Sequence, residues 1–544
     1  MNKIKNNLYS IILIVLAFLP VISLFHSGLP WTHDGQDHVV RIANFYQNLS
    51  EGNLIPRWGA NLNWGYGHPI LEFLYPLPSY IASFFHALNF SLVDSTKIVF
   101  GLGVIVSLFF MYIWLSQFTS KYASLFGAFL FTYAPYRFVD LYVRGDVGEH
   151  LAFAFVPLVL FFIYKMYKTK EFRYSVWGAL ALGLLILAHN AIALMFVPFI
   201  LFYSLYLIWL SDFNRKLIIN SLFLILFGFM LSAFFWIPGL LEGKYTLRNI
   251  VTRGGYVDRF ADIKSLIYGP WSYGQTGQFT QQLGILQWIS FILSPLFIWK
   301  YFKVKDKKIW LIIVLILYTF LAIFFMLPVS NFLWSRIMLL QNFQFPWRFL
   351  AITVFSTAVL GAFLIDFLPK KYSVYLTAFF ILIVLFISKD YMKPKAYLYK
   401  PESFYTGVYN GTTDTGESSP VWSVRFMEHG PSAHLQVLDG KAKVQELKRV
   451  SIEHVYTVKV DRSTLFAENT LYFPGWEIKA NNLPVNIQFQ NMQYRGVMLF
   501  RLDKGNYIVE AKYSETKLRF ISDLISAVSL ILLLGILGFR FVKK

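Results

Sequence analysis

A short polar cluster, Thr32-His33-Asp34-Gly35-Gln36-Asp37-His38, directly follows the first hydrophobic stretch of the chain. Two carboxylates and two imidazoles at a membrane boundary are costly to desolvate, which indicates a chemical site rather than packing. Asp34 or Asp37 could take the proton from a weak nucleophile such as a sugar hydroxyl. Structural alternatives stay open, because Asp34 could cap the helix that follows and Asp37 could favour the dipole of that helix.

Further polar residues are candidates for binding a substrate beside this cluster, namely His38, Arg57, Arg144, Asp146, Glu149, His189 and Arg348. The arginines among them would meet a phosphate group that gains negative charge as it leaves. Each candidate also has a structural alternative. The charges of Arg144-Gly-Asp-x-Gly-Glu149 could pair with one another in a turn, His189 could hydrogen-bond between helices, and Arg348 could anchor at lipid headgroups.

Metal chemistry is only weakly indicated. His38 with Asp34 or Asp37 could hold a divalent ion, but such a spacing alone is not specific. We therefore assign no metal ligand and leave the cofactor unknown, with a divalent cation as the open alternative. The chain has no cysteine, which excludes disulfides and a thiolate-bound zinc.

The composition indicates a membrane protein. Of 544 residues, 56% are hydrophobic and 15% are charged, whereas soluble domains carry about 25% charged residues. The apolar runs, roughly 17–25 residues long, suffice to cross a bilayer as helices. They predict about twelve spans, at 9–25, 97–117, 122–139, 150–167, 174–189, 190–210, 217–240, 283–300, 309–328, 349–368, 372–388 and 519–540.

The chain has a net charge of +19, and the positions of its basic residues indicate how it is oriented in the membrane. Basic residues gather in short gaps between the apolar runs, at 3–5, 121, 165–173, 215–216, 300–308, 370–371 and 540–544. With Met1 inside, all of these gaps lie on the cytoplasmic side, as the positive-inside rule requires. Both termini are then cytoplasmic, and nucleic-acid binding is disfavoured.

Three regions follow from this threading. Residues 1–389 form a transmembrane module with a large first outer loop, 26–96, in which 36–50 is patterned as an amphipathic helix. Residues 390–518 alternate polar and apolar side chains between turn signals, which predicts an extracytoplasmic, β-sandwich-like domain. Residues 519–544 form a last transmembrane helix with a basic tail. The fold class is a mainly α polytopic membrane protein with a C-terminal β domain.

Several motifs resemble the bacterial and archaeal integral membrane family labelled 6-pyruvoyl-tetrahydropterin synthase-related. They are His33-Asp34-Gly-Gln-Asp-His38-x-x-Arg41, Gly52-Asn-Leu-Ile-Pro56-Arg57-Trp58, Arg144-Gly-Asp-x-Gly-Glu149 and Phe345-Pro-Trp-Arg-Phe349. Tyr472-Phe-Pro-Gly-Trp476 is similar to the C-terminal domain of YfhO-type membrane proteins. The resemblance implies a GT-C-fold glycosyltransferase with Asp34 at the position of the catalytic acid. One helical turn would bring Asp37 to the same side, so either residue is a candidate base.

The sequence thus predicts a membrane glycosyltransferase. It would move a sugar from a polyprenyl-phosphate donor to a cell-envelope glycan, lipid or polymer acceptor at the outer face, with residues 390–518 holding the acceptor. Its expected partners are this donor, this acceptor and membrane lipids. Three alternatives remain. A transporter or flippase of lipid-linked saccharide predicts charges deep inside the spans, a non-catalytic scaffold of envelope assembly needs no carboxylate, and a polymerase or ligase would join lipid-linked oligosaccharides.

Overall fold

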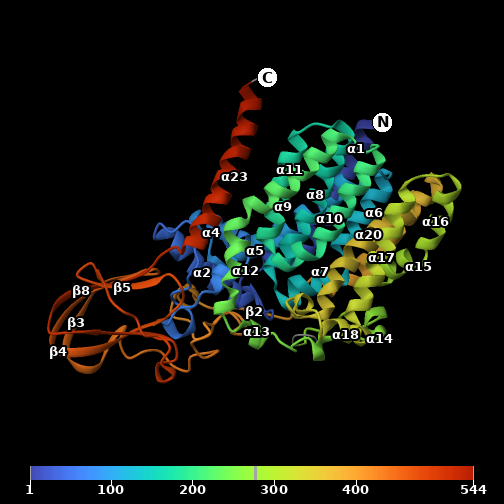
Figure 1. Cartoon of the computed structure of the whole chain (residues 1–544). Coiled ribbons are helices and arrows are strands. Elements are labelled where there is room, and N and C mark those ends of the chain that lie inside the picture. The colour runs from blue at the N-terminus through green and yellow to red at the C-terminus, as the bar shows by residue number, and fades with distance from the viewer. Residues whose placement is uncertain (1, 275–277, 543–544) are drawn as a thin grey trace.

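The long apolar runs of the sequence form one helical bundle in the computed structural model, which describes residues 2–274 and 278–542 (Figure 1). Among these residues, eight helical segments are long and apolar enough to cross a membrane. They are α5 (Leu92–Leu115), α8 (Val147–Thr169), α10 (Asn190–Leu210), α15 with α16 (Ile285–Ile292 and Ser294–Lys303), α17 (Lys308–Met326), α20 (Leu350–Phe367), α21 (Lys370–Ser388) and α23 (Lys517–Val542). The polytopic helical architecture is therefore confirmed.

The number of full-length spans is smaller than the predicted twelve. Helices α11 (Arg215–Leu231) and α12 (Ala233–Leu241) are bent by 67° at their junction and together make a ninth crossing at most. Two further apolar stretches are short, Ile11–Phe25 at the end of α1 (Asn2–Phe18) and α9 (Arg173–Ala188). The predicted span 122–139 is divided, because α6 (Lys121–Thr132) stops ahead of Pro135, which opens the separate helix α7 (Pro135–Val139).

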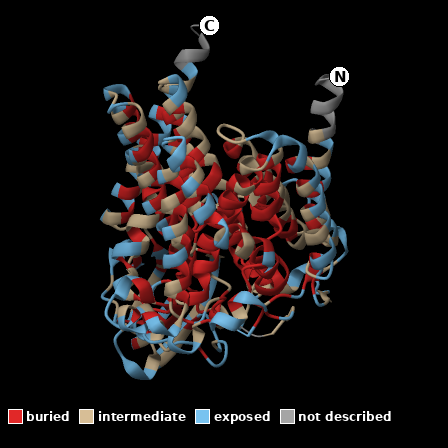
Figure 2. Cartoon of the chain, turned by 90° about the vertical axis from the view of Figure 1, so that its right-hand side faces the viewer, coloured by how far each residue is buried: buried red, intermediate tan, exposed pale blue. Residues whose placement is uncertain are grey.

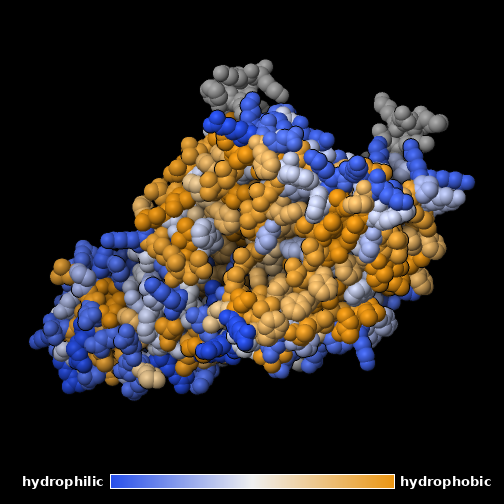
Figure 3. Space-filling view, turned by 45° about the vertical axis from the view of Figure 1, so that its right-hand side comes forward, coloured by the Kyte–Doolittle hydropathy of each residue, from blue (hydrophilic) through white to orange (hydrophobic). Residues whose placement is uncertain are grey.

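Both termini lie at the same end of the bundle (Figures 1 and 2). The opposite end, here called the loop end, is built from residues 26–91, 134–146, 242–274 and 327–349. It carries the short helices α13 (Arg248–Val251), α14 (Ile263–Ile267), α18 (Asn331–Trp334) and α19 (Met338–Gln341). A broad apolar belt separates the hydrophilic surfaces of the two ends (Figure 3). Lys543 and Lys544 of the predicted basic tail lie outside the described residues.

The first loop contains the amphipathic helix expected at 36–50, which is α2 (Gly35–Ser50). Its apolar face is buried through Val39, Val40 and Ile42. Ahead of it, β1 (Leu29–Pro30) pairs antiparallel with β2 (Tyr397–Leu398), and behind it lie α3 (Ile70–Phe73) and α4 (Leu77–Ala87). The loop is therefore an ordered layer over the bundle, tied to a segment that follows the last helix of the bundle module.

The C-terminal domain is an antiparallel sheet of six strands, in the order β3-β4-β8-β5-β6 with β7 also on β4. The strands are β3 (Leu435–Val450), β4 (Glu453–Leu471), β5 (Trp476–Ala480), β6 (Leu483–Pro484), β7 (Val497–Leu502) and β8 (Gly505–Tyr513). Strand β4 pairs with β8 over 453–460 and with β7 over 464–471. The first part of β4 thus pairs with β8 and the second part with β7, and both parts of the sheet share one apolar core. This core includes Tyr456, Phe466, Phe500 and Val509.

Residues 397–427, here called the strap, connect the bundle to this sheet and lie back on the first loop. The strap contains β2 and α22 (Glu402–Thr406). The Tyr409 N–H donates to the Asn61 carbonyl at 2.7 Å, and the Trp64 N–H donates to the Tyr409 carbonyl at 2.9 Å. The strap therefore packs on the transmembrane module, and within the predicted domain 390–518 the strands of the six-stranded sheet begin only at Leu435.

A buried charge cluster fixes α23 beside the bundle. The Arg519 guanidinium is fully buried and pairs with Glu242 at 2.5 Å and with Glu72 at 3.0 Å. Nearby, Arg57 pairs with Asp523 at 2.5 Å and with Glu515 at 3.2 Å. Arg57 and Glu72 come from the first loop, so this cluster joins that loop, the end of α12 and the C-terminal helix.

Replacing Arg519 by methionine should loosen α23. The change leaves Glu72 and Glu242 buried without their shared cation, and breaking a buried pair in this way costs about 3–5 kcal/mol. We expect faster tryptic cleavage at Lys512 or Lys517 in the detergent-solubilised protein, measured as a time course. The control is Lys393→Met, which removes an exposed pair with Asp390. Equal cleavage of both variants would contradict an anchoring role for Arg519.

Candidate functional site

The first loop and the turn before α8 are joined by backbone hydrogen bonds at the loop end. The His33 N–H donates to the Val143 carbonyl at 2.9 Å, and the Asp34 N–H donates to the Arg144 carbonyl at 2.8 Å. Gly145, with φ 73°, permits this approach, since a Cβ there would lie 2.2 Å from the Thr32 hydroxyl oxygen. The two polar motifs of the sequence therefore form one site.

Asp34 occupies the N-cap position of α2, but its side chain makes no capping hydrogen bond. The hydroxyl of Thr32 takes that role and accepts from the Gly35 N–H at 3.1 Å. Across residues 2–274 and 278–542, no hydrogen bond or ion pair engages the Asp34 carboxylate. Burial raises its pKa, while the charges of Arg144 and Arg41 partly oppose that rise. The capping alternative is thus wrong, and Asp34 presents a half-buried, unpartnered carboxylate.

Asp37 is engaged by the strap. The Tyr409 hydroxyl donates to the Asp37 carboxylate at 2.9 Å and accepts from the Gln36 side-chain amide at 3.1 Å. Burial and the Asp37 charge raise the pKa of Tyr409 to about 12, so its hydroxyl keeps the proton that it donates. The two candidate bases therefore differ: Asp34 is unpartnered, and Asp37 already accepts a hydrogen bond.

An acid–arginine network, formed by Asp140, Arg144, Asp146, Glu149 and Arg348, lies next to Asp34. The Arg144 guanidinium contacts Asp140, and it donates to Asp146 at 2.8 Å and to Glu149 at 2.9 Å. From the 3-10 turn directly before α20, Arg348 donates to the same Glu149 carboxylate at 3.1 Å. The charges around the Arg144 turn thus pair with one another, as the structural alternative for this motif predicts, and Arg348 joins them.

The arginines of this network are neutralised within it. Burial and the neighbouring Glu149 carboxylate raise the pKa of Asp140 in spite of its contact with Arg144. Burial acts in the same direction on Asp146, but the charge of Arg144, with lesser effects of other neighbours, holds its pKa below the usual range. Asp146 and Glu149 then balance Arg144 and Arg348, which leaves no free guanidinium charge in the network for a substrate phosphate.

Asp146, Glu149 and His189 place one ligand atom each within 4.8 Å of one another, a spacing that a metal ion could use. However, His189 Nδ1 accepts from the Ile192 N–H at 3.2 Å. The neutral ring therefore carries its proton on Nε2, the atom that faces Asp146 at 3.8 Å, and a protonated nitrogen cannot bind a metal. Both carboxylates already pair with guanidiniums. These three residues are therefore better described as part of the arginine network than as ligands of a divalent ion.

His38 is also held as a neutral acceptor. Its Nδ1 accepts from an Arg41 guanidinium nitrogen at 3.1 Å. Burial, and then the Arg41 charge, lower the pKa of His38 to about 3. His38 thus serves Arg41 rather than Asp34 or Asp37, and this arrangement gives no support to a metal site among these three residues.

Tyr75 connects the first loop to the network and was not selected by sequence reasoning. Its hydroxyl donates to Asp146 at 2.8 Å, and its ring lies 4.6 Å from the His189 ring. Gly148 makes room for it, because a Cβ there would overlap the Tyr75 ring. Tyr409 and the strap residue Thr413 are further residues here that the sequence did not single out, since their partners are distant in the chain. Arg41 is part of the first-loop motif, but the sequence assigned it no role.

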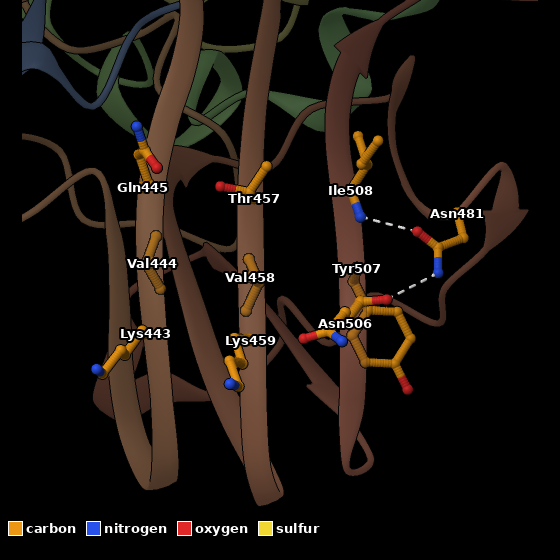
Figure 4. Close-up of a pocket in the computed structure, with 10 residues that line it drawn as sticks. All are labelled: Lys443, Val444, Gln445, Thr457, Val458, Lys459, Asn481, Asn506, Tyr507 and Ile508. Atoms are coloured by element: carbon orange, nitrogen blue, oxygen red, sulfur yellow. Dashed lines mark hydrogen bonds between the residues drawn. The ribbon is translucent and has the colours of Figure 1, made fainter.

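Of the candidates from the sequence, most meet at the loop end: Asp34, Asp37, His38, Arg144, Asp146, Glu149, His189 and Arg348. Arg57 does not join them, because its guanidinium is engaged by Glu515, Asp523 and the Phe234 carbonyl. A separate hollow of about 370 Å³ lies on the exposed face of the β-sheet (Figure 4). Lys443 and Lys459, directly paired across β3 and β4, line it together with Tyr507.

A family model described as 6-pyruvoyl-tetrahydropterin synthase related domain, membrane protein, matches residues 71–393. This range contains the acid–arginine network and begins after Asp34. An uncharacterized protein of Lactococcus lactis subsp. cremoris (strain MG1363) is 28% identical over 255 residues, which are 43% of this chain and 41% of that protein. The match thus covers less than half of that relative.

Two solved structures of the Archaeoglobus fulgidus oligosaccharyltransferase are similar to this chain. The apo form gives a TM-score of 0.45 at 12% identity, over 77% of this chain and 62% of that one. The complex with Zn and sulfate gives a TM-score of 0.42 at 15% identity, over 76% of this chain and 59% of that one. Both likenesses cover less than two thirds of the oligosaccharyltransferase.

Proposed function

We propose a function for this chain, which belongs to the 6-pyruvoyl-tetrahydropterin synthase related family of membrane proteins: it is a membrane glycosyltransferase. It moves a sugar from a polyprenyl-phosphate donor to a cell-envelope glycan, lipid or polymer acceptor. The observation that carries the proposal is the unpartnered Asp34 carboxylate, half-buried at one end of an apolar bundle. A carboxylate held in this way is suited to accept a proton.

In the proposed reaction, Asp34 is the general base. The acceptor hydroxyl gives its proton to Asp34 while its oxygen forms a bond to the anomeric carbon of the sugar. The bond between that carbon and the phosphate oxygen breaks, and its electron pair stays on the lipid phosphate. Asp37 is the weaker candidate, because the Tyr409 hydroxyl already donates to it. The acid–arginine network holds the Asp34 backbone through the Arg144 carbonyl.

The proposed topology places the loop end and the β domain outside the membrane, with both termini in the cytoplasm. The helices alternate in direction, so the basic gaps at 165–173, 300–308 and 370–371 lie at the end of the termini. Basic gaps on one side of a bundle favour the cytoplasm. The lipid chain of the donor would then lie against the apolar belt of Figure 3.

The β domain is proposed to hold the acceptor. Lys443 and Lys459 face each other across two strands on the exposed sheet face, although like charges in that position are unfavourable. Thr457 and Asn506 supply hydrogen-bonding groups to the same hollow (Figure 4). Such a surface suits a polar glycan, particularly one that carries negative charge.

The test of this function is label transfer in proteoliposomes. Full-length protein is reconstituted with a radiolabelled polyprenyl-phosphate sugar and with envelope extract from cells that lack the protein. We expect label to leave the lipid and enter the glycan or glycolipid fraction, and protein-free vesicles to show none. Label that crosses the bilayer while still lipid-linked would overturn the proposal in favour of a transporter. Label that neither moves nor transfers, with donor and acceptor present, would favour a scaffold.

Transfer should also fall on the acid side at a higher pH than an ordinary aspartate would give. The base must be unprotonated, and burial raises the pKa of Asp34. Activity is therefore complete above that raised pKa and is lost as the pH falls through it. The measurement is the pH profile of kcat/KM, with the folded state checked at each pH by size-exclusion chromatography. A flat profile across the acid range would argue against a buried carboxylate as base.

A further inference from the structure

Arg41 is a buried arginine of α2 that has no carboxylate partner. Its side chain is 7% exposed. The Nε atom donates to the Thr413 hydroxyl at 3.0 Å, and one terminal nitrogen donates to His38 Nδ1 at 3.1 Å. Both partners are neutral. In the described part of the chain, no carboxylate lies within ion-pair distance of this guanidinium.

Four other buried arginines of this region differ in this respect. Arg144 and Arg348 pair with the carboxylates of their network, and Arg57 and Arg519 pair with the acids near α23. Arg137 of α7 also has no carboxylate within ion-pair distance among the described residues, but both of its terminal nitrogens donate within the bundle, to the His150 and Gly103 carbonyls and the Ser107 hydroxyl. A buried charge is normally paired, because removing it from water without a counter-charge is costly. The cost at Arg41 is therefore unbalanced within the described residues, and an anionic ligand would balance it.

The surroundings of Arg41 place this missing anion beside the proposed base. Asp34 immediately precedes α2, and Arg41 lies about two helical turns further along, where its charge acts to lower the pKa of both Asp34 and Tyr75. His38 orients the guanidinium from the same helix, and Thr413 orients it from the strap, which is 372 residues away in the chain. Two nitrogens of the planar Arg41 guanidinium are thus held in place before any ligand binds. Such preorganisation favours recognition of a phosphate group by the guanidinium.

We propose that Arg41, positioned by His38 and Thr413, binds the phosphate group of the donor. The inference rests on the proposed function and assigns the phosphate to a residue other than Arg57, Arg144 or Arg348, whose guanidiniums already pair with carboxylates. A guanidinium donates two parallel hydrogen bonds to phosphate. When the sugar leaves, the electron pair of the broken bond remains on a phosphate oxygen, and the Arg41 charge stabilises it.

The first experiment measures binding rather than transfer. Full-length protein in detergent is titrated with radiolabelled polyprenyl phosphate, and in a second arm the bound label is competed with inorganic phosphate. We expect Arg41→Gln to weaken binding by at least about tenfold, the loss of one charge-assisted contact. Arg253→Gln, which removes an exposed arginine at the same end of the bundle, should leave binding unchanged. Equal affinity of Arg41→Gln and wild type would overturn the assignment.

A second variant keeps the test decisive if Arg41→Gln fails to fold. Thr413→Val preserves the shape of the strap residue and removes its hydroxyl, which accepts the Arg41 Nε bond and donates to the carbonyl of the neighbouring Thr412 at 2.6 Å. We expect a smaller loss of affinity, about two- to fivefold, from one neutral hydrogen bond. Arg41→Lys keeps the charge and loses the fork, so its affinity should lie between those of wild type and Arg41→Gln. If Thr413→Val and Arg41→Lys both bind the polyprenyl phosphate as tightly as wild type, the role of Arg41 is refuted.

The binding and competition measurements distinguish a lipid-linked phosphate from free phosphate as the ligand. Together with the transfer assay, they also distinguish failure of the Arg41 site from failure of the glycosyltransferase proposal. Competition by inorganic phosphate would show that the phosphate group alone suffices, and its failure would show that recognition requires the lipid-linked form. If binding depends on Arg41 but wild type transfers no sugar, the phosphate site stands and the glycosyltransferase proposal fails. If transfer depends on Asp34 but Arg41→Gln alters neither binding nor transfer, the function stands and the phosphate site fails.

Discussion

Replacing Asp34 by asparagine should lower sugar transfer by about two to four orders of magnitude, the usual contribution of a general base. Asparagine has the shape of aspartate but cannot accept the proton of an acceptor hydroxyl. The Asp34 carboxylate makes no hydrogen bond within the described chain, so the change breaks no contact that supports the fold. Transfer of label in proteoliposomes measures the effect, with the amount of folded protein matched between the samples.

The matched comparison is Asp37→Asn, three residues along the same helix. That change weakens the hydrogen bond from the Tyr409 hydroxyl and leaves Asp34 intact. We expect transfer to fall by less than about tenfold, as for a single hydrogen bond near a site. Donor binding should persist in both variants. A larger loss in Asp37→Asn than in Asp34→Asn would identify Asp37 as the base, and equal transfer by Asp34→Asn and wild type would exclude Asp34.

The order of elements in the first loop could be read from the sequence because the pattern is local. The helix over 36–50 follows from the spacing of Val39, Val40 and Ile42, and the structure has it as α2. The division of the span at 122–139 was missed, although Pro135 marks the break. A run of apolar residues does not reveal whether the backbone bends within it, since hydrophobicity reports length and not direction.

The electrostatics of the site could not be read in the same way. An aspartate before a helix is a typical cap, and only the structure shows that Thr32 replaces Asp34 in that role. Arg348 and Glu149 are 199 residues apart, yet they share an ion pair. Thr413 reaches Arg41 from 372 residues away in the chain. Residue types pointed to most of the polar residues that meet at the loop end, but which of their charges are paired depends on tertiary contacts.

Replacing Arg144 by methionine should give the largest loss of stability. Arg144 contacts Asp140, Asp146 and Glu149 and lies 4.7 Å above the Trp347 ring. Without it, Asp146 and Glu149 share the single guanidinium of Arg348, and the buried Asp140 carboxyl loses its ion pair. Removing one partner of a buried ion pair costs about 3–5 kcal/mol. The fraction of monodisperse protein that survives heating in detergent measures the effect.

The control is Arg173→Met, which breaks a pair with Glu171 in which both side chains are more than 40% exposed, at 44% and 43%. Exposed pairs contribute about 0–1 kcal/mol, so this variant should survive heating like wild type. Adding Glu149→Gln to Arg144→Met should restore part of the lost stability, because it removes a carboxylate that has lost its partner. If Arg144→Met were as stable as Arg173→Met, the network would not be holding the turn that positions Asp34. The base would then depend on α2 and Thr32 alone.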